Sequence, residues 1–137
     1  MGAFVRGQQG QFTRSINIGV PSGNGVTQHP MVFTFNEVSQ EYFAETCKRI
    51  NDVGDDGMPS PQKTELYSGI CREIVAGWQP NGNVFQETDG SPVEFSQQNL
   101  NEFLTLPLIA DTIIAGWLNA HTARQDSGNS KGRRSGG

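Results

Sequence analysis

Residues that could support catalysis or metal binding are few in this chain and lie far apart. His29 and His121 each lack a second ligand at a metal-binding spacing such as H-x-x-x-H or C-x-x-C. Cys47 and Cys71 form no close pair, and two thiols are too few for a secreted disulfide scaffold, which favours a reducing compartment. We therefore expect no metal site, no catalytic histidine, and two cysteines that pack as small apolar residues.

Two short segments resemble ligand-binding loops, but their spacing does not fit. Gly23, Asn24 and Gly25 lack the third glycine of a dinucleotide loop, and no predicted helix opens behind them. With Asp52 as the first ligand of a calcium loop, the twelfth position is Lys63 instead of the required glutamate. A nucleophile elbow is also missing. The sequence therefore predicts a protein that is not an enzyme and that binds no cofactor.

Composition and charge restrict the possible partners. The 137 residues are 34% hydrophobic, and no apolar run approaches the length of about 18 residues that spans a bilayer. Residues 1–123 carry six Lys and Arg against thirteen Asp and Glu, a net charge of −7, whereas residues 124–137 carry a net charge of +3. An acidic body opposes tight phosphate binding, and four basic residues in the tail would give only weak, salt-sensitive contacts. We expect neither a nucleic-acid partner nor a membrane partner.

Hydrophobic periodicity predicts a hairpin followed by helices. Apolar residues alternate over 12–20 and again over 31–35, which is the pattern of half-buried strands. The turn residues between these two runs indicate a hairpin with a long, mobile loop. Ser39 and Ser96 each precede an apolar stripe at helical spacing and are expected to act as helix N-caps. Another helix is expected to begin near Ser60, with Pro61 at its first position.

The second helix is expected to end at Gly77 and Pro80, and the last helix to begin with Pro107 in its first turn. In the last helix the expected apolar stripe contains Ile109, Ile113, Trp117 and Ala120, broadened by Leu108 and Ile114. From Gln125 onward no apolar residue remains to offset the entropy of ordering. We therefore predict a small, mostly helical α+β protein with a flexible N-terminus (1–10), a single domain (11–123) and a disordered basic tail (124–137).

The two tryptophans allow two interpretations. Trp78 and Trp117 each follow a glycine near or within a helix and can anchor the core, or they can be exposed anchors of a partner-binding surface, where tryptophan is favoured. The candidate partner-binding residues are therefore the large apolar side chains of the second half of the chain: Trp78, Phe95, Leu100, Phe103, Leu104 and Trp117.

The order of several segments resembles a known family. The chain contains MVFTFNEVSQEYF, then IVAGW, then VEFSQQNLNEFLTLPLIADTIIAGW and a polar basic tail. Over roughly residues 31–123 this order is similar to the tail assembly chaperones of long-tailed bacteriophages. It is most like the small chaperone of siphophages related to lambda and HK97. The V-x-F-S-x-x-N-L-x-x-x-L block carries most of the resemblance, and the N-terminal hairpin matches less well.

The resemblance implies a non-catalytic protein in the cytoplasm of an infected bacterium. Such chaperones coat the long, helical tape-measure protein, recruit tail-tube subunits, and are absent from the finished virion. In the family, a programmed frameshift near the end of the gene makes a longer form, and the basic tail ending at Gly137 lies where that shift would occur; Ser130, Lys131 and Gly132 merely allow it. We also expect a homo-oligomer, open or spiral, because many weak copies in line multiply modest affinities. The alternative is a structural tail or head–tail joining protein that stays in the virion.

Overall fold

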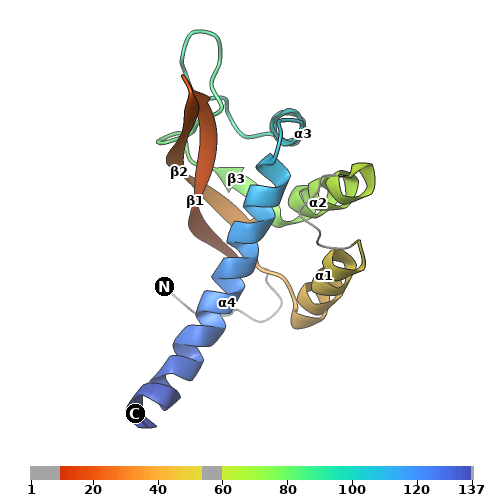
Figure 1. Ribbon diagram of the computed structural model, residues 1–137, viewed down its shortest axis with the longest axis vertical. Helices are drawn as coiled ribbons and strands as arrows, with labels where there is room; N and C mark the ends of the chain where they lie inside the picture. The colour runs from red at the N-terminus through yellow and green to blue at the C-terminus, as the bar shows by residue number, and fades with distance from the viewer. Residues whose placement is uncertain (1–9, 54–59, 137) are drawn as a thin grey trace.

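The computed structural model describes residues 10–53 and 60–136, and of residues 123–136 it describes the backbone alone. These parts form an α+β fold in which a three-stranded antiparallel sheet, in the order β1-β2-β3, packs against four helices. Figure 1 shows α4 passing between the sheet and the helices α1 and α2. The predicted α+β class is confirmed.

The hairpin has the predicted alternation but a much shorter connection. Strand β1 (Gln11–Ser22) pairs with β2 (Gly25–Asn36) without interruption, from Gln11 opposite Asn36 to Ser22 opposite Gly25. Only two residues connect the strands, and Gly23 takes the positive φ of 57° that this tight turn requires. The expectation of a long, mobile loop is wrong, because the strands continue through residues that favour turns.

Three helices begin where the sequence predicts, each at an N-cap serine whose Oγ accepts a hydrogen bond from a backbone N–H. Ser39 accepts from Tyr42 at 3.0 Å ahead of α1 (Gln40–Asp52), and Ser60 accepts from Lys63 at 3.1 Å ahead of α2 (Pro61–Ile74). Ser96 does the same for α3 (Gln97–Leu104). Each cap satisfies one of the N–H groups that a helix start leaves without a partner.

The third strand departs from the sequence-based expectation. The second helix ends at Ile74, and Val75–Trp78 form β3, which pairs with β2 opposite Phe33, Thr34 and Phe35. The expected helix through Gly77 is therefore wrong. An available edge of β2 overrides local helix propensity here, and the N–H of Gln79 continues the pairing by donating to the carbonyl of Val32 at 3.0 Å.

The last helix, α4, spans Ile109–Gly136 and crosses β1 (Figure 1). Its backbone continues as a helix through 124–136, which the sequence predicts as an unfolded tail. The side chains of 123–137 lie outside the described residues, so the disorder of that segment stays a prediction. The flexible N-terminus predicted for residues 1–10 lies outside the described residues except for Gly10.

Candidate partner-binding surface

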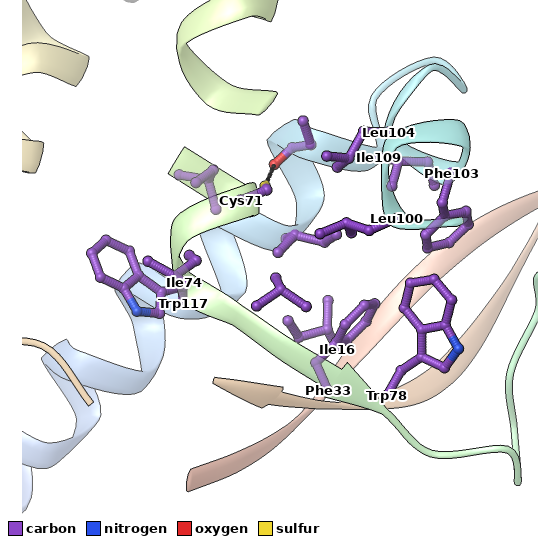
Figure 2. Packing of buried hydrophobic residues seen from close by; sticks show 14 of the residues in the cluster. Ile16, Phe33, Cys71, Ile74, Trp78, Leu100, Phe103, Leu104, Ile109 and Trp117 are labelled. Carbon is purple, nitrogen blue, oxygen red and sulfur yellow. Dashed lines mark hydrogen bonds between the residues drawn. The ribbon is translucent and has the colours of Figure 1, made fainter. Parts of the chain in front are cut away.

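Five of the six candidate partner-binding residues are buried. Figure 2 shows Trp78, Leu100, Phe103, Leu104 and Trp117 within the core, and none of these side chains is more than 8% exposed. Only Phe95 is partly exposed. The structure thus assigns both tryptophans to the core, and these five side chains expose little surface to a partner.

Trp78 joins the sheet to the segment that precedes α3. Its indole Nε1–H donates to the carbonyl of Val93 at 2.9 Å, which satisfies the polar end of a side chain that is otherwise buried among apolar groups. Its ring meets Phe95 and Phe103 edge-on, with centroids 5.0 and 5.6 Å apart. Trp78 therefore fixes residues 93–95 against the core and leaves one side of Phe95 at the surface.

The block that carries the family resemblance builds this same local structure. Ser96 Oγ accepts from the N–H of Asn99 at 3.0 Å, and the Asn99 side-chain amide donates back to the carbonyl of Glu94 at 2.8 Å. Leu100, one turn on, is fully buried. The V-E-F-S-x-x-N-L pattern thus specifies a capped helix start and its core contact.

Trp117 joins α4 to α1. Phe43 packs on Trp117 with ring centroids 5.4 Å apart and on His121 at 4.5 Å, so the side chains of both elements form one aromatic cluster. Within the described part of the chain, the buried Nε1–H of Trp117 has no hydrogen-bond partner. His121 packs within this cluster, against Phe12, Phe43 and Trp117.

The apolar side chains that do reach solvent lie elsewhere. Leu106 and Leu108, on either side of Pro107, are 44% and 63% exposed in the turn between α3 and α4. The spacing predicts Leu108 on the buried stripe of the last helix, with Pro107 in its first turn. That placement is wrong, because the helix begins at Ile109. No sequence signal marks this difference, since an L-P-L-I run fits a helix start equally well.

Leu108 also has an unfavourable backbone conformation. Its φ is 66°, a left-handed value that costs a non-glycine residue free energy because the Cβ crowds the backbone. Its carbonyl accepts hydrogen bonds from the backbone N–H and the hydroxyl of Thr112, at 3.0 and 2.8 Å. Leu108 therefore starts α4 in a geometry that suits glycine better, while its side chain lies in solvent. We call Leu106, Pro107 and Leu108 the interhelical apolar turn.

Two titratable groups among the described residues have strongly raised pKa values. Burial raises the pKa of the Cys71 thiol to about 12, and its Sγ lies 3.8 Å from the carbonyl of Ala110, so it stays a protonated core residue at neutral pH. Burial, with a hydrogen bond to Glu73, raises the pKa of Tyr42 to about 12. Among the described residues no group of His, Cys, Asp and Glu could hold a metal ion.

The surface hollows are shallow and of mixed polarity. One of them, of about 1110 Å³, runs between α1 and α4 and is lined by residues that include Val38, Phe43, Cys47 and His121. In the described residues no single helix is long and apolar enough to cross a membrane, and α3 with the start of α4 reaches that length only as a pair bent by 107°.

Neither a protein-family model nor a curated protein nor a solved structure matches the chain.

Proposed function

We propose that this chain is a bacteriophage tail assembly chaperone. It binds the tape-measure protein and recruits tail-tube subunits during tail morphogenesis, without catalysing a reaction. The proposal rests on the resemblance over residues 31–123 and on one feature of the fold, the interhelical apolar turn. It acts in the host bacterial cytoplasm as a homo-oligomer and is absent from the mature virion.

The interhelical apolar turn suits such a partner for a physical reason. A long helical scaffold exposes apolar stripes until the tube encloses it, and shallow, exposed leucines can cover these stripes without a deep pocket. Leu108 supports this interpretation because its backbone geometry would favour glycine, so an exposed leucine at this position has a cost in stability. Phe95 stays a candidate contact because it is partly exposed.

Co-expression with a tape-measure protein tests the proposal. We expect the wild-type chain to keep that protein soluble and to co-purify with it, and we expect the double variant Leu106→Ser/Leu108→Ser to lose most of this effect. Val26→Ser is a matched control, because Val26 is 63% exposed, as Leu108 is, but lies at the hairpin tip. If the wild-type chain neither solubilises nor retains the tape-measure protein, the proposal is wrong. Equal loss in the double variant and the control would exclude the interhelical apolar turn as the contact.

The alternative function is a structural tail or head–tail joining protein, in which the hairpin mediates ring assembly. Mass spectrometry of purified virions separates the two. Abundant peptides of this chain in the particle would support the alternative, whereas their absence beside abundant peptides in the infected cell supports the chaperone. The same measurement on infected cells detects a longer, frameshifted form, which we propose branches off near Lys131.

A further inference from the structure

Strand β1 has an outer edge whose backbone groups can be assigned from the register. The N–H of Glu37 donates to the carbonyl of Gly10 at 2.8 Å, and this pair continues the register of Gln11 opposite Asn36. In an antiparallel pair, hydrogen-bonded and non-hydrogen-bonded positions alternate. Even-numbered residues of β1 therefore bond to β2, and odd-numbered residues direct their N–H and C=O groups away from it.

The other side of β2 confirms this alternation. Val32 faces the odd-numbered Ser15, and its carbonyl accepts from the N–H of Gln79, on the side of β2 away from β1. The outward backbone groups of β1 belong to Gln11, Thr13, Ser15, Asn17 and Gly19, all with exposed side chains. No other strand among the described residues pairs with this side of β1. We call these outward groups the β1 edge.

The β1 edge lacks the features that normally prevent strands from associating. Arg14 is the single charged residue in β1, the register runs without a bulge, and Pro21 interrupts the outward N–H groups only near the turn. Charges, bulges and prolines are the usual devices that protect an exposed edge, and a long edge without them is a template for another strand. The β1 edge is thus suited to pair with a strand.

The sheet itself indicates which strand fits. Head-to-tail growth would place the β1 edge against the opposite edge of the sheet, but β3 has only four residues and an irregular register. The β1 strand of a second copy offers an edge of equal length. With a two-fold axis between them, both copies use the same edge, so no edge of β1 is left unpaired. If that axis lies at Ser15, Arg14 faces a neutral residue of the other copy, so no like charges lie directly opposite each other.

We propose that two copies of this chain pair antiparallel through the β1 edge, which gives a continuous sheet in the order β3-β2-β1-β1-β2-β3. This arrangement closes on itself, unlike the open or spiral assembly expected from the sequence. It does not depend on the proposed function, because a virion component would present the same edge.

Light scattering during gel filtration, from roughly 1 to 500 µM protein, measures the assembly over the affinity range of small interfaces. We expect a monomer–dimer equilibrium for the wild-type chain. Ser15→Pro removes an outward N–H while leaving every bond to β2 in place, and we expect it to weaken the dimer by at least about ten-fold. The double variant Ser15→Lys/Asn17→Lys places charges along the edge and keeps the test valid if the proline variant does not fold.

Asn101→Lys is the matched control, because it adds an exposed charge to α3 instead of to the hairpin. Amide hydrogen exchange gives an independent readout. In the dimer the N–H groups of Thr13, Ser15 and Asn17 should be protected, and this protection should disappear on dilution while that of Ile16 and Ile18 stays. A wild-type chain that is monomeric throughout, larger assemblies without a dimer, or a dimer unaffected by both edge variants would overturn the proposal.

Discussion

Gly116 of α4 lies directly against Ile16 of β1. A Cβ built at position 116 would come within 2.6 Å of both Cδ1 and Cγ1 of Ile16. Because Ile16 is itself buried, only a glycine lets the helix approach the strand this closely. The contact sets the distance between α4 and the sheet, which in turn positions the turn that precedes α4.

The contact between Gly116 and Ile16 gives the first prediction. Gly116→Ala should lower the free energy of unfolding by about 1–3 kcal/mol, since crowding in the core outweighs the gain in helix propensity. Gly69→Ala in α2 is the control, because its Cβ would meet nothing closer than the Arg72 side chain at 3.8 Å. The control should gain about 0.5–1 kcal/mol. Urea unfolding measures both, and a stabilised Gly116→Ala variant would contradict the packing described.

The second prediction concerns the strained leucine. Leu108→Gly should raise the free energy of unfolding by about 0.5–1 kcal/mol, because glycine adopts a φ of 66° without steric cost. Leu106→Gly should lower it by a similar amount of about 0.5–1 kcal/mol, since Leu106 has no positive φ and loses only chain restriction. Thermal or urea unfolding decides the sign. If Leu108→Gly is destabilised as much as Leu106→Gly, the strain is absent.

The third prediction separates structure from binding in the block that resembles the phage chaperones. Ser96→Ala removes the N-cap of α3 and should cost about 1 kcal/mol of stability, whereas Ser96→Asp should retain most of it. Neither variant should weaken co-purification with a tape-measure protein at a temperature where it is folded, because Ser96 acts through the helix start. Selective loss of binding in a fully folded Ser96→Ala variant would place Ser96 in the interface.

The fourth prediction is a pH dependence. In the folded chain the pKa of Cys71 is raised from 9.0 to about 12 by burial, so the native state holds its proton where the unfolded state releases it. The contribution of Cys71 to the free energy of unfolding is therefore fully present below about pH 9 and is lost as the pH rises towards 12. Tyr42, raised to about 12, acts in the same direction above pH 10.

Urea unfolding at several alkaline pH values tests this dependence. Cys71→Ala should be less stable at pH 7 but should lose less stability per pH unit above pH 9. In the folded wild-type chain, a thiol reagent at pH 8 should modify Cys47 well before the fully buried Cys71. Equal reaction rates for the two thiols would contradict the burial of Cys71.

The sequence predicted the elements whose signals are local. The alternation around Ile16 and Phe33 specifies the hairpin, and Ser39, Ser60 and Ser96 specify three helix starts, because in each case neighbouring residues decide the conformation. Strand β3 was missed because Val75–Trp78 become a strand only when β2 offers an edge to pair with. That pairing joins residues about 40 positions apart, which no local pattern contains.

The candidate surface was harder to predict than the fold, for a related reason. Trp78 and Trp117 have side chains that suit a core and an interface equally well, and their burial depends on Phe95, Phe103 and Phe43 packing against them. Leu108 was assigned to the core because its spacing fits the stripe of α4. Its exposure follows from the backbone turn at Pro107, where one residue of offset moves a side chain from the core to solvent.

The separation of the two indoles also gives the protein a pair of built-in optical reporters. Trp78 is hydrogen-bonded beside the sheet and α3, whereas Trp117, on α4, packs against Phe43 of α1 without such a bond among the described residues. Their emission spectra should therefore differ. Trp78→Phe leaves only Trp117, beside α1, and Trp117→Phe leaves only Trp78, beside the sheet and α3. A ligand, a partner or a second copy that disturbs the surroundings of one tryptophan can then be located by the variant whose emission changes.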